Sequence, residues 1–128
     1  MQKDFDNWNI LKKKIDSDEQ TFHVNERQIW WCSIGLNVGS EQNGHGENFE
    51  RPVLVIRKYT ATTFLCLPLT TKEKQGNYYH KIYSKIDPQS WVILSQSKVI
   101  DIKRFRRFLG SIQRKEFIQI TNKYKELL

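Results

Sequence analysis

The chain has few of the residues that build cross-linked or membrane-spanning proteins. Its 128 residues include two cysteines, three prolines and one methionine. Cys32 and Cys66 lie inside apolar runs and form no Cys-x-x-Cys or Cys/His spacing, so we expect buried, reduced thiols and no zinc site. No run of 18 apolar residues occurs, and the polar N-terminus lacks the apolar stretch of a signal peptide. We therefore expect a soluble, cytoplasmic protein.

Positive charge is present in excess but is unevenly distributed. The formal net charge is +7. Residues 1–50 hold five lysines and arginines and nine acidic residues, whereas residues 51–128 hold sixteen and five. Such an asymmetry suits a basic face that contacts phosphates, although a well-solvated surface would have the same composition.

The N-terminal segment has the pattern of one short amphipathic helix. Between residues 3 and 15 the apolar side chains Phe5, Trp8, Leu11 and Ile15 recur at steps of three and four. A polar stretch up to Asn25 follows and breaks this pattern. We predict an N-terminal helical extension and connector over residues 1–25 and a main domain over residues 26–128.

The main domain has the texture of a small β structure. Short runs of aromatic and β-branched residues alternate with turn formers, which predicts strands at Gln28–Ile34, Pro52–Tyr59, Thr62–Leu69, Tyr78–Ile82, Ser90–Leu94 and Lys98–Ile100. Pro68 predicts that the third run leaves the sheet or lies at an edge, because proline donates no ladder hydrogen bond. Several short strands in about seventy residues are typical of a small, bent barrel.

The helical period returns near the C-terminus. Asp101 can cap a helical turn over Ile102 to Phe108 that Gly110 ends. A final helix from about Arg114 presents one apolar side, formed by Phe117, Ile120, Tyr124 and Leu127. The predicted fold class is α+β and mainly β, with one helix before the barrel and helices after it.

One long segment lacks any regular pattern. Gly35 to Glu50 contains four of the six glycines and lies between two predicted strands. Loops of this length in a compact domain are usually functional or disordered. The segment is not a nucleotide-binding loop, because no Gly-Lys-Ser/Thr follows and it opens no helix.

Several short motifs lie within this segment and on either side of it. They read RQIWW from Arg27, GSEQ from Gly39, RPVLVI from Arg51, PLTT from Pro68, and LSQSKVID from Leu94 with Arg104 downstream. Each piece is weak alone, but the ordered set over roughly residues 26–128 resembles the MazF/PemK toxins of bacterial toxin–antitoxin pairs.

The resemblance implies a fold, an activity and partners. It implies an SH3-like β-barrel of the CcdB/MazF type and a sequence-specific endoribonuclease that cuts single-stranded RNA without metal or cofactor. It also implies a homodimer whose groove an antitoxin segment blocks.

The same resemblance assigns roles to individual residues. Arg51 matches a catalytic arginine, and its guanidinium can grip two phosphate oxygens. Thr70 matches a catalytic or phosphate-contacting threonine, and Thr71 can add a second hydroxyl donor. Ser40, Gln42 and Gln96 are candidate substrate contacts.

The general base is the least certain of these roles. Some relatives carry a histidine where Ser40 stands or an aspartate where Ser95 stands, and this chain has neither. Glu41 is the first candidate for the base, and His45 in the same loop is the second because imidazole titrates near neutrality. His80 is a weaker candidate for a contact to a base of the RNA.

Two adjacent tryptophans lie in the first predicted strand. Trp30 and Trp31 are consecutive in a predicted strand, so they point to opposite faces and one of them should be in the core. We expect the other, like Trp91, to pack against the N-terminal helix or a dimer contact rather than against RNA.

Two alternatives to a nuclease remain open. A gyrase-binding toxin of the CcdB type shares the general architecture, and an inactive nucleic-acid-binding barrel would explain the missing histidine and aspartate. Arg51 and the Pro68–Thr71 turn favour cleavage, because a gyrase binder has no evident need for them.

Overall fold

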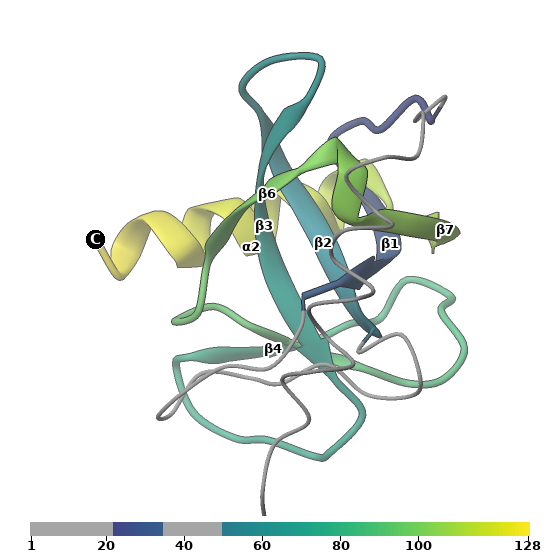
Figure 1. Cartoon of the computed structure of the whole chain (residues 1–128). Coiled ribbons are helices and arrows are strands. Elements are labelled where there is room, and N and C mark those ends of the chain that lie inside the picture. The colour runs from purple at the N-terminus through teal and green to yellow at the C-terminus, as the bar shows by residue number, and fades with distance from the viewer. Residues whose placement is uncertain (1–21, 35–49) are drawn as a thin grey trace, which may run out of the picture.

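The computed structural model describes residues 22–34 and 50–128 (Figure 1). Its elements are β1 (Gln28–Ser33), β2 (Glu50–Lys58), β3 (Thr63–Thr70), β4 (Tyr79–Lys81), β5 (Trp91–Ile93), β6 (Lys98–Asp101), the 3-10 turn η1 (Ile102–Arg104), β7 (Phe105–Ser111) and α2 (Arg114–Glu126). None of the described helices is long and apolar enough to cross a membrane.

The strands form a mostly antiparallel sheet with β2 and β3 at its centre. Its order is β4-β5-β3-β2-β1-β7, and β6 pairs with β3 off this path. In the described part of the chain the sheet ends at β4 and β7 and is not closed, so the barrel stays a prediction.

Both faces of the central strands are buried. Val53 and Val55 point into one apolar cluster with Phe64 and Phe105, whose rings pack edge to face at 5.2 Å. Leu54 alternates to the other face and joins a second cluster. Burial on both faces explains why β2 and β3 read as continuous apolar runs rather than as alternating patterns.

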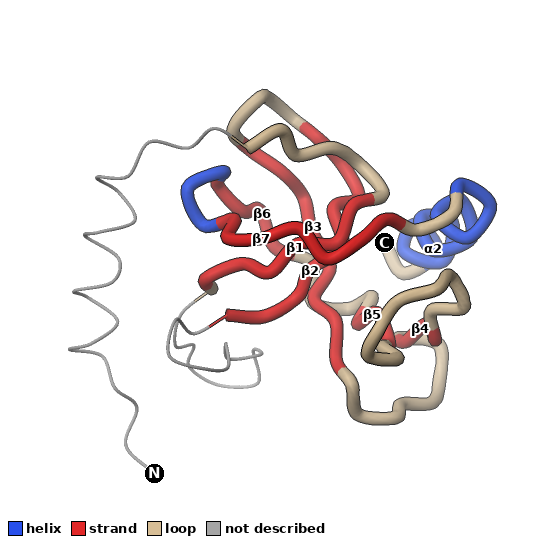
Figure 2. Tube along the Cα trace, turned by 90° about the vertical axis from the view of Figure 1, so that its right-hand side faces the viewer, coloured by secondary structure: helices blue, strands red, loops and turns tan. Residues whose placement is uncertain are grey.

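Helix α2 covers the second cluster. Ile120 is fully buried there, and Phe117, Tyr124 and Leu127 pack around it, which confirms the predicted apolar side. Figure 2 shows α2 on one side of the strands. The sheet therefore has one face covered by this helix, the α2 face, and an opposite face.

Six of the strands lie where the sequence predicts them, within two residues at each end. The seventh strand, β7, was missed. Asp101 caps η1 as predicted, its side chain accepting a hydrogen bond from the Lys103 amide at 2.9 Å, but the helical turn stops at Arg104. The rest of the predicted turn, including Gly110, pairs with β1 as a strand.

The prediction for β7 was wrong because tertiary pairing outweighs the local pattern. Strand β1 offers the backbone groups of its outer edge, and Phe105 is fully buried in the first cluster. Buried backbone groups must be paired, so β7 takes an extended conformation along that edge. A single C-terminal helix, α2, therefore follows the sheet.

Pro68 lies inside β3, opposite Val53 of β2. On its other side β3 changes partner, because the pairing with β6 ends at Cys66 and the pairing with β5 begins at Leu69. Proline is thus tolerated at the point between two partners, where its missing N–H breaks no ladder. The predicted departure from the sheet is a change of partner.

Both cysteines are buried and free, as expected. Burial raises the pKa of each thiol above its ordinary value, so both remain protonated and unreactive. The predicted N-terminal helix and most of the Gly35–Glu50 segment lie outside the described residues.

Candidate functional site

The start of β2 and the end of β3 bring Arg51 and Thr70 together. The antiparallel register pairs Val53 with Pro68, Leu54 with Leu67 and Val55 with Cys66. Continued by two residues, the same register sets Arg51 opposite Thr70. Residues directly opposite each other in an antiparallel pair have Cβ atoms about 5 Å apart and share one face of the sheet.

Arg51 is a buried charge at the rim of a cavity. Only 4% of the residue is exposed, and β1 fixes its backbone through the pair Cys32–Arg51. Burial lowers the pKa of the guanidinium from its ordinary value, yet an arginine stays protonated at neutral pH. A desolvated guanidinium interacts more strongly with an anion than an exposed one does.

Thr70 is held with its hydroxyl in a defined position. The residue is buried, and its Oγ1 accepts a hydrogen bond from the Lys72 amide at 3.2 Å. Because the oxygen is the acceptor in this contact, the hydroxyl hydrogen can be donated to a phosphate oxygen.

Both residues line a cavity of about 460 Å³ at the end of the sheet. Because the cavity lies where β2 begins and β3 ends, residues of both faces reach it. Its basic side chains are Lys72 and Lys74, and its other lining residues are Trp31, Pro52, Leu69, Thr71, Pro88, Ser90 and Leu109. The cavity combines several cations with apolar walls, as a site for a nucleotide does.

The two adjacent tryptophans point to opposite faces, as predicted. Trp30 is buried in the first cluster. Trp31 is half-buried and lines the large cavity, with the Arg107 guanidinium 4.9 Å from the centre of its ring. Trp31 is therefore a wall of the site, a role that its sequence position did not reveal.

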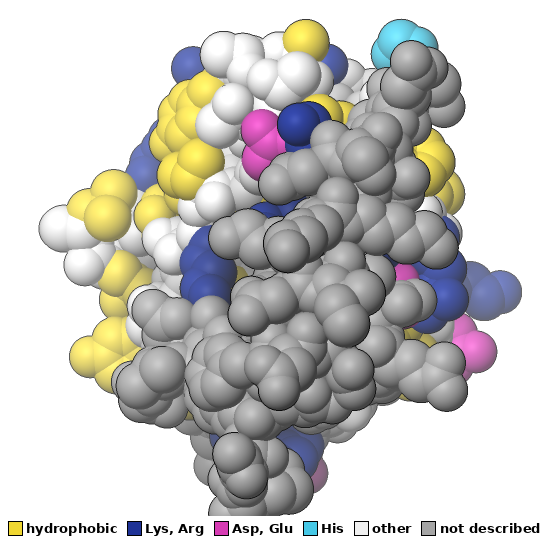
Figure 3. All heavy atoms as spheres, viewed as in Figure 1, with side chains coloured by type: hydrophobic (Ala, Val, Ile, Leu, Met, Phe, Trp, Pro, Cys, Tyr) yellow, Lys and Arg dark blue, Asp and Glu magenta, His cyan; other side chains and the backbone are white. Residues whose placement is uncertain are grey.

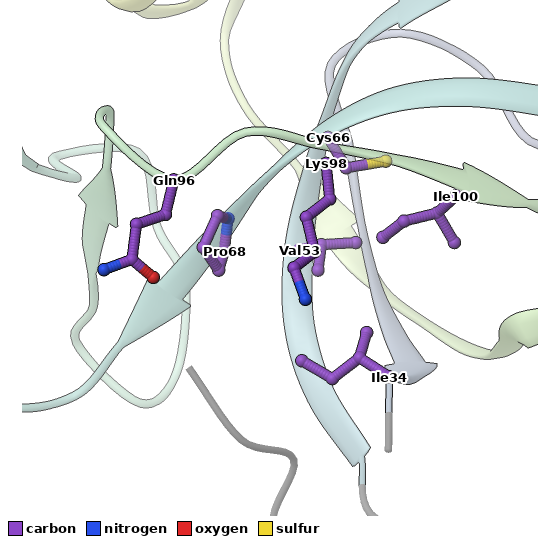
Figure 4. A pocket seen from close by; sticks show the side chains of 7 residues that line it. All are labelled: Ile34, Val53, Cys66, Pro68, Gln96, Lys98 and Ile100. Carbon is purple, nitrogen blue, oxygen red and sulfur yellow. The ribbon is translucent and has the colours of Figure 1, made fainter. Parts of the chain in front are cut away.

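A second, much smaller hollow adjoins Arg51 and Thr70 on the face opposite α2. It is lined by Ile34, Val53, Cys66, Pro68, Gln96, Lys98 and Ile100. Figure 4 shows Gln96 beside Pro68 and Lys98 reaching past Val53. Val53 and Pro68 lie two residues along their strands from Arg51 and Thr70, so the predicted contact Gln96 lines the neighbouring hollow and not the large cavity itself.

Basic side chains border this face in the space-filling view. Figure 3 shows several Lys and Arg side chains on the side of the molecule that faces the viewer. Ser40, Glu41, Gln42 and His45 lie outside the described residues, so their predicted roles stay predictions. Within residues 22–34 and 50–128, no group of three or more His, Cys, Asp or Glu side chains could hold a metal ion.

His80 belongs to another part of the molecule. It is buried on the α2 face, where its Nε2 lies 2.8 Å from the Glu116 carboxylate and its Nδ1 lies 2.9 Å from Lys123 Nζ. Contacts to RNA are excluded for a side chain held in this way. The buried carboxylate inside the apolar side of α2 had no signal in the sequence.

The chain is similar to known proteins over most of its length. A model of the family described as PemK-like, MazF-like toxin of type II toxin–antitoxin system matches residues 25–128. No curated protein sequence matches the chain.

Solved structures share the fold at low sequence identity. MazF from Deinococcus radiodurans superposes with a TM-score of 0.66 and 15% identity, covering 83% of this chain and 96% of that one. An endoribonuclease in complex with its cognate antitoxin from a mycobacterial species superposes with a TM-score of 0.64 and 13% identity, covering 80% and 92%. With the family model matching 25–128, the chain belongs to the PemK-like, MazF-like toxins of type II toxin–antitoxin systems.

Proposed function

We propose that this chain is the toxin of a toxin–antitoxin pair and cleaves single-stranded RNA without a metal ion. The observation that carries the proposal is the juxtaposition of Arg51 and Thr70 on the rim of a 460 Å³ cavity. The family match supports the same activity, as do solved relatives whose names describe endoribonucleases.

RNA supplies its own nucleophile. The 2′-oxygen attacks the adjacent phosphorus, a base accepts its proton, the bond from phosphorus to the 5′-oxygen breaks, and that oxygen takes up a proton. The products are a 2′,3′-cyclic phosphate and a 5′-hydroxyl. The protein must align the oxygens, move protons and stabilise negative charge on the phosphoryl group.

The described residues suit the electrostatic part of this reaction. Arg51 can bind two phosphoryl oxygens at once, and its burial keeps water from screening the contact. Thr70 can donate its hydroxyl hydrogen to one of the same two non-bridging oxygens, because each of them can accept more than one hydrogen bond. Thr71 and Gln96 are proposed substrate contacts beside them.

The remaining roles fall on the loop before β2. We assign the base to Glu41, with His45 as the second candidate and as a substrate contact, and further substrate contacts to Ser40 and Gln42. The proposal includes a cytoplasmic homodimer of SH3-like barrels and inhibition by a cognate antitoxin. Antitoxin complexes of solved relatives support the last point.

The direct test is incubation of purified protein with unstructured RNA in EDTA. We expect cleavage products that end in a cyclic phosphate, identified by mass spectrometry. Thr70→Val removes the hydroxyl while keeping the shape and should slow cleavage by about 10²-fold, the usual loss when one transition-state donor is removed. Intact RNA after incubation with folded wild-type protein would refute the proposal, and DNA damage without RNA cleavage would favour a gyrase-binding toxin.

A further inference from the structure

A straight row of side chains continues from Arg51 and Thr70 across the sheet. Thr70 of β3 pairs with Trp91 of β5, and Trp91 pairs with Lys81 of β4. Directly paired residues share one face and lie next to each other. The order across four strands is therefore Arg51, Thr70, Trp91, Lys81.

This row lies on the face opposite α2. Leu69 and Val92, which adjoin Thr70 and Trp91 in sequence, belong to the cluster that α2 covers. His80, which adjoins Lys81, is bonded to Glu116 of α2. Since consecutive strand residues alternate between faces, Thr70, Trp91 and Lys81 of the row point away from α2.

Trp91 and Lys81 are open at the surface. Trp91 is half-buried and belongs to neither apolar cluster, while Lys81 is exposed. The Lys81 ammonium lies 5.6 Å from the centre of the Trp91 ring. The pair thus offers a flat aromatic surface and a cation beside the proposed phosphate site.

A second pair of the same kind stands next to the first. Tyr79, two residues before Lys81, has the Lys74 ammonium 5.8 Å from its ring centre and also lines a hollow beside Lys123 of α2. Lys74 also lines the large cavity. Cations alternating with aromatic rings along a track are the usual means of binding single-stranded nucleic acid without reading its sequence.

We propose that Trp91 and Lys81 form a subsite for single-stranded RNA adjoining the cleaved phosphate, in which the indole stacks on a base and the ammonium binds the next phosphate. This inference rests on the proposed nuclease function. It adds the path of the bound RNA, which runs from Arg51 across β3 and β5 to β4. The subsite binds the substrate and takes no part in bond breaking.

The test measures RNA binding separately from cleavage. The ligand is a single-stranded RNA whose cleavage by the wild-type protein has been mapped, made resistant by 2′-O-methyl at the cut position. Trp91→Val should weaken its binding about tenfold, since one stacked base typically contributes that much. Trp91→Phe keeps an aromatic face and should restore most of the affinity, which shows that the loss is not a folding defect.

The role of the Lys81 charge is tested through the salt dependence of RNA affinity. Removing one phosphate contact to a single strand lowers the slope of log affinity against log salt by about 0.7. We expect this change for Lys81→Gln and no change for the control Lys125→Gln on α2. Tyr59→Val removes an exposed aromatic residue that directly follows the end of β2, and it is the matched control for Trp91→Val.

The kinetics separate this inference from the proposed function. On cleavable RNA, Trp91→Val should raise KM about tenfold and leave kcat within about threefold. The reason is that stacking on Trp91 stabilises the bound substrate and the transition state equally. If the wild-type protein cuts RNA and both variants bind and cut as it does, the subsite is refuted while the nuclease stands. If the wild-type protein binds RNA but does not cut it, the nuclease is refuted. The affinity and the salt slope are then measured on an unmodified single-stranded RNA and still decide the subsite.

Discussion

Two buried charges, Arg51 and Glu116, lie on different sides of the same sheet and differ in their surroundings. Glu116 is fully buried and accepts hydrogen bonds from inside the fold: from the amide and hydroxyl of Ser84, from the Tyr83 amide, and from His80. Arg51 is also buried, but it lines a cavity together with the cations Lys72 and Lys74.

The difference appears in their pKa values. Burial by itself would raise the pKa of Glu116, but the bonds from Ser84, Tyr83 and His80 outweigh it and hold the pKa below the ordinary value. For Arg51, burial lowers the pKa, so the charged form is disfavoured. The internal hydrogen bonds favour the charged form of Glu116, whereas burial disfavours the charged form of Arg51, an effect that a bound phosphate would oppose.

The first and largest expected effect separates activity from stability at Arg51. Arg51→Met removes the guanidinium and keeps an apolar stem, so the RNA cleavage rate should fall by about 10²- to 10³-fold. The melting temperature should change little, because Met keeps the apolar stem and the desolvation cost of the charge disappears together with its contacts. Arg57→Met, an exposed arginine of the same strand, is the control and should cleave normally. A large drop in melting temperature with Arg51→Met would show that Arg51 is structural.

The second effect has the opposite signature at Glu116. Glu116→Gln places an amide among donors that all point at a carboxylate, so the free energy of unfolding should fall by about 2–3 kcal/mol. Cleavage per folded molecule should stay near the wild-type value. Urea unfolding measures the change, with the exposed Glu126→Gln on the same helix as the control. Unchanged stability would contradict the structural role.

The third effect is a pH dependence with a defined sign. Because the pKa of Glu116 is lowered from its ordinary value of 4.5, its contribution to stability is present above that pH. It is lost as the pH falls through the lowered value, when the folded carboxylate is protonated. The difference in unfolding free energy between wild-type and Glu116→Gln protein should therefore shrink below about pH 4.5. A difference that grows on acidification would reverse the sign and contradict the assignment.

The smallest effect concerns an ion pair near the surface. Glu50 and Arg107 join the start of β2 to β7 at 3.5 Å, with 61% of the Arg107 side chain exposed. Exposed pairs contribute little, so Glu50→Gln should change the free energy of unfolding by less than about 1 kcal/mol. A larger loss would show that this pair anchors Arg107 over Trp31.

Sequence patterns predicted the parts of the fold that depend on local signals. The strand runs and the apolar side of α2 were visible because period and burial agree there. Strand β7 could not be recognised from the sequence. Its residues, FRRFLGS from Phe105, directly follow the helical turn η1 and become a strand only by pairing with β1.

The candidate site was predictable only in part. The motif order identified Arg51, Thr70 and Gln96, which the structure brings close to one another. Trp31 and Trp91 were expected at the N-terminal helix or a dimer contact, and the place of Trp31 in the cavity wall was not foreseen. Which face a strand residue occupies depends on register and on where α2 packs. The cluster around Glu116 joins residues 32 and 36 positions apart, a separation that no local pattern reports.

The central claim is that Arg51 and Thr70 act on the same phosphate, and a double-mutant cycle on the single-turnover cleavage rate tests it most directly. If both groups hold one phosphoryl group, the Arg51→Met and Thr70→Val losses will not multiply, and the double variant will cleave little more slowly than Arg51→Met alone. A double variant whose loss is the full product of the two, or a Thr70→Val protein that cleaves at the wild-type rate, would contradict the account.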